Sequence, residues 1–405
     1  MTGMRSRKII SLLAIAMFIL TLTSAALTQE NVITFGCALP LTGALATEGE
    51  KHLHGYELWK DTVNAAGGLN VAGKIYKVEI KYYDYKSDTA TAVKLVEKLI
   101  TEDGVKFIFG PHGSGSAKAV SAVTEKYRIP MIAPSASSEE VFTQGYKYIF
   151  GTFTPNPTLT EPLADIAMKQ ANPPKSMAII ARNDLFPLAI GECARTSAQK
   201  RNIDVVYFEK YPVGSTDLSP LLIQVKAKNP DWLFATGYAE DLILIKRQMK
   251  ELGINVKIVT MIAGAAYQEF IDALGKDAEN VTTAAWWHPA TKYNGTDYWG
   301  TASKFVAAFK AKYGYVPDYV PASAATVGLI FQRAIEKAGV LDSVKVRDEI
   351  SKSDFLTFFG PIKFDARGMS IALDPPVIQI QNGKHVAIHP SSIAESKLVY
   401  PMPTK

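Results

Sequence analysis

Hydroxyl side chains gather in two short loops of this sequence, at residues 110–116 and 134–138. Each loop follows an apolar segment that is typical of a buried strand and precedes a segment that is typical of a helix. Parallel strands that each lead into a helix place such loops at one edge of their sheet. Backbone N–H groups at two helix N-termini, with the hydroxyls of Ser114, Ser135 and Ser137, would favour an anion such as a carboxylate.

His112 lies two residues before Ser114 and raises a second possibility, a secreted serine hydrolase in which the imidazole activates the hydroxyl. The chain has no G-x-S-x-G nucleophile elbow, and no motif places a third residue to orient the histidine. We therefore expect ligand binding rather than catalysis. Ser114 and Ser137 are also candidates for simple helix caps, a role that is compatible with binding an anion.

The segments that must position these loops alternate between strand and helix. We expect a strand at 32–40, a helix at 50–66, a strand at 75–83 and a helix that Asp88 caps, before the strand that leads to Ser114. The same alternation begins again near residue 175. It predicts an α/β protein with two doubly wound, Rossmann-like lobes.

Three pairs of segments suggest that the two lobes repeat one plan. The strand-and-loop segments 32–43, 105–115 and 128–138 correspond in pattern, not in identity, to 177–187, 230–240 and 256–266. In the second lobe the first of these loops contains Arg182 and Phe186, and the second contains Tyr238. Arg182 is expected to pair either with a ligand anion or with Asp184, and the two aromatic side chains either contact a ligand or fill the core.

Three segments, at 150–155, 284–289 and 358–360, are expected to cross between the lobes as hinges. The predicted N-terminal lobe is 27–150 plus 288–357, and the C-terminal lobe is 151–287 plus 358–405. Helices expected at 301–314 and 322–339 would pack back on the first lobe. Lobes joined in this way typically close on a ligand by hinge motion. Phe153, Trp286 and Trp287, near the crossings, are candidates for the core or for the ligand site.

The first 26 residues are predicted to be a cleaved signal peptide, because basic residues precede an apolar run at 9–22 and small residues follow it. The apolar run is shorter than the ~20 residues of a membrane span, and no lipoprotein cysteine follows. A periplasmic protein is therefore expected. The net charge of +5 is mild and spread along the chain, which argues against nucleic-acid binding.

The cysteines and histidines indicate no metal and no cofactor. Cys37 and Cys193 fall in different predicted lobes, so we expect two free, buried thiols, with a bridge between the lobes as the alternative. The six histidines are scattered, and His52 and His54 are expected on the surface of a helix rather than on a metal.

Several segments together resemble those of the periplasmic substrate-binding proteins of the leucine/isoleucine/valine class, the receptors of ABC importers. They are the residues 39–68, 106–116, 128–153, 232–248 and 360–368, and the resemblance covers the mature chain in order. It implies a type I periplasmic binding protein fold and a monomer that delivers a small acid or amino acid to a membrane permease. It also implies that a carboxylate is held by Ser114 and by the turn Ser135, Ala136 and Ser137, with Tyr238 and Phe186 closing from the second lobe.

One departure from this family bears on the ligand. Amino-acid receptors of the class hold the ligand ammonium with an acidic residue on the loop where this chain has Ala263. Gly113 likewise stands where some members have a disulfide cysteine. Because a buried ammonium without a carboxylate is costly, we expect an apolar or aromatic acid as ligand. The alternative is a true branched-chain amino acid or amide receptor in which another residue supplies the ammonium contact.

Overall fold

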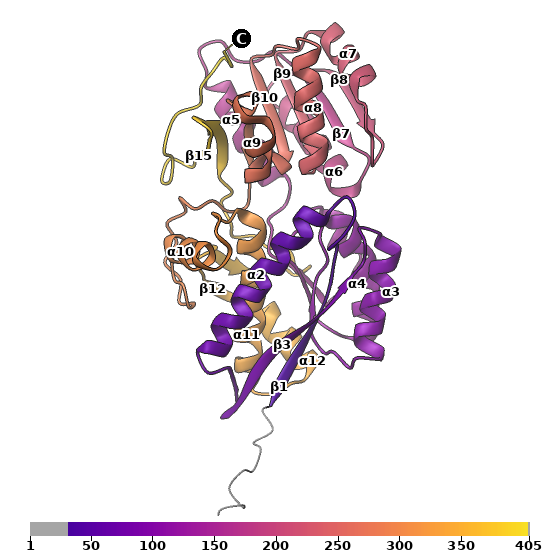
Figure 1. The fold of residues 1–405 in the computed structure, drawn as a ribbon, viewed down its shortest axis with the longest axis vertical. Coiled ribbons are helices and arrows are strands. Elements are labelled where there is room, and N and C mark those ends of the chain that lie inside the picture. Colours follow the sequence, from indigo (N-terminus) through magenta and orange to yellow (C-terminus); the bar gives the residue numbers. More distant parts are fainter. Residues whose placement is uncertain (1–30, 404–405) are drawn as a thin grey trace, which may run out of the picture. The chain divides into compact units, whose positions relative to one another are not determined.

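Two largely parallel β-sheets with helices on their faces organise the computed structural model, which describes residues 31–403 (Figure 1). The expected signal peptide at 1–26 lies outside these residues. In the described part of the chain, no helix combines the length and the apolar character needed to cross a bilayer.

The first sheet has the strand order β2-β3-β1-β4-β5-β6. Strands β1, β4, β5 and β6 run parallel, and only β2 pairs antiparallel, with β3. Apolar residues occupy nearly every position of the central strands because helices cover both faces of the sheet. The elements are β1 (Val32–Leu39), α2 (Ala46–Ala65), β2 (Leu69–Val71), β3 (Lys74–Asp84), α3 (Thr89–Thr101), β4 (Ile108–Phe109), α4 (Ser114–Tyr127), β5 (Met131–Ala133) and β6 (Ile149–Gly151).

The second sheet has the order β15-β14-β11-β10-β9-β7-β8, parallel from β11 to β8, with an antiparallel edge of β14 and β15. A helix again follows each of the strands β7, β8, β9 and β10. The elements are α5 (Pro157–Met168), β7 (Ser176–Arg182), α6 (Leu185–Gln199), β8 (Asp204–Tyr211), α7 (Ser219–Lys228), β9 (Trp232–Gly237), α8 (Ala239–Glu251), β10 (Ile258–Ala263), α9 (Gln268–Leu274), β11 (Thr282–Ala284), β14 (Val377–Gln381) and β15 (Lys384–His389).

The strand orders confirm the internal repeat expected from the sequence. The run β3-β1-β4-β5 of the first sheet has the same connectivity as β8-β7-β9-β10 of the second. The paired segments therefore occupy equivalent places, and each sheet presents three matching loops at the C-terminal ends of its strands.

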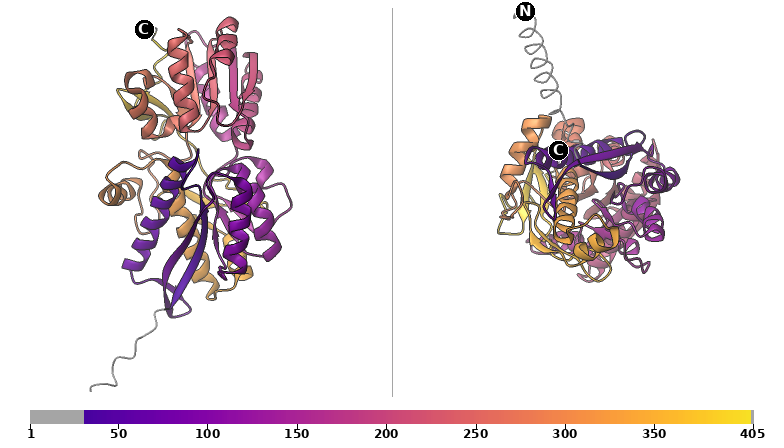
Figure 2. Two further views of the ribbon diagram at one scale, coloured as in Figure 1. Left: turned by 45° about the vertical axis from the view of Figure 1, so that its right-hand side comes forward. Right: turned by 90° about the horizontal axis from the view of Figure 1, so that it is seen from below.

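Helices late in the chain pack on the first sheet's helices, as predicted. Helix α11 (Tyr319–Ala338) lies beside α2, with indigo and orange ribbons adjacent in both views (Figures 1 and 2), and also contacts α12 (Ser343–Ser351). The contact is close because Gly328 faces the Trp59 ring, where an added Cβ would lie 2.1 Å from a ring carbon. Helix α10 (Ala302–Tyr313) also contacts α2.

The third expected crossing between lobes lies elsewhere in the structure. Residues 358–360 are in the turn of a hairpin formed by β12 (Asp354–Leu356) and β13 (Pro361–Lys363), closed by the Thr357 N–H donating to the Gly360 carbonyl at 2.9 Å. After this hairpin Met369 still bridges to Gly151 of the first sheet, and the chain joins the second sheet only at β14. The exact bounds of the lobes stay a prediction.

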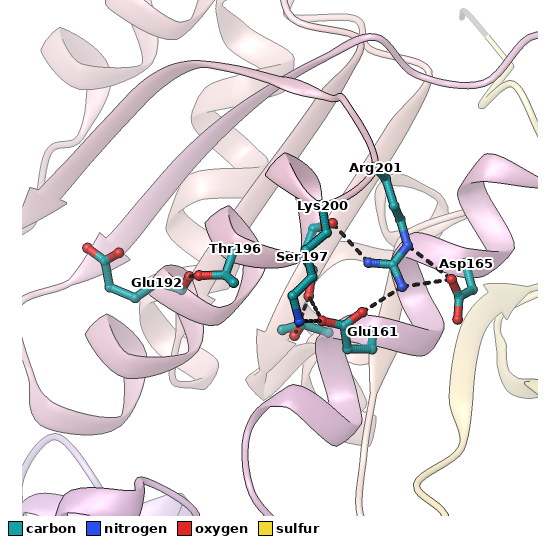
Figure 3. A network of polar contacts seen from close by, with 8 residues as sticks. Glu161, Asp165, Glu192, Thr196, Ser197, Lys200 and Arg201 are labelled. Atoms are coloured by element: carbon teal, nitrogen blue, oxygen red, sulfur yellow. Dashed lines mark hydrogen bonds and ion pairs between the residues drawn. The ribbon is translucent and has the colours of Figure 1, made fainter.

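Each lobe has its own stabilising contacts. In the first, the Phe35 ring stacks on Phe109 at 4.9 Å and meets Trp59 edge-on at 5.5 Å, so truncation of Phe35 to alanine would cost roughly 3–5 kcal/mol. In the second, α5 and α6 are joined by Arg201, whose guanidinium contacts Asp165 at 2.7 Å and Glu161 at 2.6 Å (Figure 3).

Three sequence predictions near the ligand-facing edge were wrong. The loop after β5 opens no α-helix but one 3₁₀ turn, Glu139–Val141, because the chain must return to the sheet at β6, which begins at Ile149. Helix α2 begins at Ala46 rather than near residue 50. His52 on this helix is fully buried instead of lying on the surface.

Candidate functional site

The two switch points of strand order define where a ligand can be held. In the first sheet the chain changes direction between β1 and β4, and in the second between β7 and β9. Ligands of doubly wound sheets bind outside the carboxyl ends of the strands at such points. In the first sheet, Glu48 in the first turn of α2 and His112 in the loop after β4 lie there. In the second sheet, Arg182 at the end of β7 and Tyr238 in the loop after β9 lie there.

A narrow pocket lies at these loops. Its volume of about 10 Å³ is near the space that one water molecule needs. Aromatic rings from both sheets and from the connecting segments make up most of its wall. It is lined by His112, Gly113, Ser135, Phe153, Phe186, Tyr238, Ala263, Tyr267, Trp286 and Tyr319.

The aromatic wall holds itself together through ring contacts. Phe153 and Trp286 stack with centroids 3.9 Å apart, and the Trp286 indole N–H donates to the Thr154 carbonyl at 3.1 Å. The hydroxyls of Tyr267 and Tyr319 meet at 3.1 Å. The wall therefore presents flat apolar faces to a space of about 10 Å³, so the wall must open before it can enclose more than a water molecule.

Ser114 is buried next to the pocket but does not line it, and it is not a helix cap. The N-cap of α4 is Gly113, with φ +82°, and Ser114 is the first helical residue. The Ser114 Oγ accepts hydrogen bonds from the Ser137 and Ser138 N–H groups, each at 3.2 Å. Both lone pairs of the hydroxyl are thus used, and its single hydrogen is left for donation to a further acceptor.

Ser135 lies in the pocket wall, whereas Ala136 and Ser137 are buried outside it. The Ser135 Oγ accepts from the Gly113 N–H at 3.0 Å and contacts the His112 Nδ1 at 3.3 Å. The Ser137 hydroxyl donates to the Asn156 side chain at 2.7 Å. These bonds fix the two predicted loops to each other, so the predicted corner exists with one α-helix N-terminus instead of two.

His112 has the environment of a neutral side chain. Burial, reinforced by nearby His52 and Arg182, lowers its pKa well below the ordinary value. Its Nδ1 meets Ser135, and no hydrogen bond joins it to Ser114 in the described residues. The hydroxyl that a hydrolase would need is instead held by two backbone N–H groups.

Arg182 pairs with Asp241 and not with Asp184, while its pairing with a ligand anion stays a prediction. Its guanidinium donates to the Asp241 carboxylate at 2.9 Å, and both side chains are almost fully buried. The same carboxylate accepts from the Tyr238 N–H at 3.0 Å, and the Arg182 guanidinium lies 4.9 Å from the centre of the Tyr238 ring. Arg182 and Asp241 therefore position Tyr238, the aromatic residue expected at this loop.

Sequence reasoning missed Glu48, in the first turn of α2. Its side chain is 1% exposed, and its Oε1 has no hydrogen-bond partner among the described residues. Burial raises its pKa to about 7, against the lowering effect of the Glu48 and Ala239 backbone N–H groups and of the charges on Lys51 and Arg182. Glu48 is followed closely by two more charged residues, Glu50 and Lys51, and this pattern is typical of an exposed helix start.

Lys51, one turn further along α2, joins elements of both sheets. Its ammonium contacts Glu269 of α9 at 2.9 Å and Asp318, beside α11, at 2.7 Å. It also lies 4.9 Å from the centre of the Tyr267 ring, in the pocket wall. Asp318 and Glu269 raise the pKa of Lys51 despite its burial, whereas burial raises the pKa of Asp318.

Other expectations concern thiols and metals. Cys37 and Cys193 are free, as predicted, although only Cys37 is fully buried. Within residues 31–403 no group of three histidine, cysteine or acidic side chains could hold a metal ion.

Comparisons with known proteins agree with this architecture. Residues 32–384 match the model of the family described as "Periplasmic binding protein". The chain is 29% identical over 382 residues to "Leu/Ile/Val-binding protein homolog 8" of Brucella abortus, covering 90% of this chain and 92% of that protein.

Solved structures show the same fold. The branched-chain amino acid transporter substrate-binding protein LivJ of Streptococcus pneumoniae, in complex with isoleucine, superposes with a TM-score of 0.78 at 25% identity, covering 92% of this chain and 100% of that one. A solute-binding protein of R. palustris in complex with benzoate gives a TM-score of 0.76 at 18% identity, with 92% and 99% covered. The two-lobed type I periplasmic binding protein fold is thus shown, and the chain belongs to the periplasmic binding protein family, in the class of the Leu/Ile/Val-binding proteins.

Proposed function

We propose that this protein is a periplasmic receptor that binds a small carboxylate with an apolar or aromatic body and delivers it to the membrane permease of an ABC importer. It acts without chemistry on the ligand, as a monomer exported by its signal peptide and without affinity for nucleic acid. The aromatic pocket at the two switch points is the observation that carries this proposal.

The first lobe supplies the carboxylate contacts in this proposal. The Ser114 hydroxyl has one hydrogen to donate, and the first turn of α4 has backbone N–H groups without partners inside the helix. His112 and Ser135 complete this corner. These N–H and O–H donors would replace the hydrogen bonds that the carboxylate gives up when it leaves water.

The second lobe closes over the ligand body with Tyr238 and Phe186, while Arg182 holds Tyr238 in place. Names of similar proteins support the ligand class: leucine, isoleucine and valine in relatives, isoleucine in one solved structure and benzoate in another. These ligands share a carboxylate and an apolar body.

Two measurements test the proposal. Mass spectrometry of the small molecules released from the purified, denatured protein should identify a carboxylate of this class. Thermal-shift screening of amino acids, benzoates and cinnamates should find at least one that raises the melting temperature at micromolar concentration. Absence of binding by every carboxylate, or steady turnover of esters or amides that Ser114→Ala abolishes, would refute it.

A further inference from the structure

Buried polar atoms without partners gather beside the pocket. The Oε1 of Glu48, the Nε2 of His52 and the Nε2 of His112 are all inaccessible to solvent and lack hydrogen-bond partners among the described residues. Native proteins leave few such atoms unpaired. The two imidazole rings lie 5.1 Å apart, and Glu48 is one turn before His52 on α2. The three atoms therefore belong to one cluster rather than to separate defects.

Two members of the cluster, His52 and Glu48, present hydrogen-bond acceptors. The His52 Nδ1 lies 2.7 Å from the Glu48 carbonyl oxygen, which can only accept, so this nitrogen carries the proton. The other nitrogen of the neutral ring, Nε2, then presents a lone pair. Burial lowers the pKa of His52 to about 4, which keeps the ring neutral at pH 7. An ionised Glu48 carboxylate likewise accepts only.

Glu48 is also well placed to reach a ligand. The N–H of Ala239, the residue after Tyr238, lies close enough to the Glu48 carboxylate to lower its pKa. The His52 ring, one turn after Glu48 on α2, lies 5.1 Å from the ring of His112, which lines the pocket. The Glu48 carboxylate is therefore buried behind the pocket wall, and its Oε1 has no partner among the described residues.

In the part of the chain that the structure describes, no lysine or arginine forms an ion pair with this carboxylate. Lys51 bonds to Glu269 and Asp318, and Arg182 bonds to Asp241. A buried carboxylate and a neighbouring imidazole lone pair best match a compact cation with several N–H donors.

We infer that Glu48 binds the ammonium group of the ligand from the first lobe, with His52 as a second acceptor, and so replaces the acidic residue whose place Ala263 occupies. This inference rests on the proposed function and narrows its ligand class to α-amino acids with an apolar or aromatic side chain. Ala263 does line the pocket, so the second lobe offers a methyl group there.

The test compares ligands that differ only in the ammonium group. Isothermal titration calorimetry on the mature chain should use leucine against 4-methylpentanoate and phenylalanine against 3-phenylpropanoate. In the wild type at least one amino acid should bind more tightly than its deaminated partner by about tenfold or more, the effect of one charged hydrogen bond. Glu48→Gln should weaken amino-acid binding by roughly 10- to 100-fold and leave the deaminated acids within about threefold.

Glu50→Gln is the matched control, because Glu50 is on the same helix with its side chain 70% exposed. This substitution should leave the affinity for the amino acids and for the deaminated acids unchanged. Equal weakening of both members of a pair by Glu48→Gln, which a purely structural link to Ala239 would cause, overturns the inference. So does deaminated-acid binding that equals or exceeds amino-acid binding in the wild type. Failure of all four ligands would instead count against the proposed function.

A second measurement needs no variant. Because the unliganded carboxyl has a pKa of about 7, capture of an ammonium at pH 7 should ionise it and release about half a proton per ligand. Titrations of the wild type in two buffers of different ionisation enthalpy would give this number. Proton uptake, as expected if Glu48 donated to a ligand carboxylate, contradicts the inference.

Discussion

The pH dependence of stability should change when Glu48 is replaced by glutamine. Glu48 is buried in the first turn of α2, and burial raises its pKa from an ordinary 4.5 to about 7 in the folded protein. Glutamine has nearly the same shape and can keep the contact with the Ala239 N–H through its carbonyl oxygen. The substitution therefore removes the titration with little change in packing.

The size and sign of the effect follow from this pKa difference. Below about pH 4.5 the carboxyl is protonated in the folded and unfolded chains, so its charge costs nothing. As the pH rises through about 7 the folded protein must carry a buried charge, and the stability that the protonated form provided is lost. A difference of about 2.5 pKa units corresponds to about 3 kcal/mol at 1.36 kcal/mol per unit.

The assay is thermal or denaturant unfolding of the wild type and of Glu48→Gln between pH 4 and pH 9, without ligand. The stability of the variant relative to the wild type should rise by about 3 kcal/mol across this range. With an unfolding entropy of ~0.8 kcal/mol/K for roughly 370 residues, this equals about 4 °C in melting temperature. The nearby charges of Lys51 and Arg182 already enter the quoted pKa.

Glu50→Gln serves again as the control for removing a carboxylate from this helix, and its effect should stay within about 0.5 kcal/mol at each pH. A stability difference for Glu48→Gln that is flat with pH, or that falls as the pH rises, would refute the reasoning that Glu48 is buried with an open oxygen.

Three further substitutions test other parts of the site. Ser114→Ala removes the acceptor of two loop N–H groups and one donor, so ligand affinity measured by calorimetry should fall at least about tenfold. Lys51→Met leaves the Glu269 and Asp318 carboxylates unpaired, so the free energy of unfolding should fall by about 3 kcal/mol in a denaturant titration. Gly113→Ala strains a φ of +82° and brings Cβ to 3.3 Å from the Tyr238 hydroxyl, so it should lower both stability and affinity.

Each of these has a matched control in the chain. Ser121→Ala removes a buried hydroxyl from the same helix α4 that bonds only within it and to Gln144, and should leave affinity unchanged. Lys60→Met removes an α2 lysine paired with Glu57 one turn away, with a small expected effect. Gly145→Ala has a similar φ of +78° with no atom near its Cβ, so it should affect stability alone. Equal effects in test and control variants would contradict the roles assigned to the site.

Local patterns in the sequence predicted the lobes because strand alternation and loop chemistry are local properties. The equivalence of segments 32–43 and 177–187 reappears as the shared strand order of the two sheets. His112, Ser135, Phe186 and Tyr238 line the pocket because they come at the ends of predicted strands.

Long-range contacts could not be predicted in the same way. Arg182 finds its partner Asp241 59 residues later, through packing of β7 beside β9. Tyr319 enters the pocket from α11, a helix whose pattern indicated only packing on the first lobe. Glu48 has the sequence context of a solvated first-turn acid, and its burial depends on contacts between segments far apart in the chain, Ala239 of α8 among them.

Glu48 and Lys51, one turn apart on α2, would make closure of the lobes depend on the charge of the ligand. Glu48 lies near the Ala239 N–H at the start of α8, and the Lys51 ammonium contacts Glu269 on α9, so both residues reach the second sheet. The Glu48 carboxylate has no cation bonded to it among the described residues, whereas Lys51 is paired with Glu269 and Asp318. The Lys51 ion pairs can therefore hold the lobes together whatever the ligand. The buried Glu48 carboxyl, in contrast, ionises favourably only when a cation lies beside it. Under this arrangement a ligand without an ammonium group would close the lobes against a neutral Glu48, and an amino acid would close them with the charge in place.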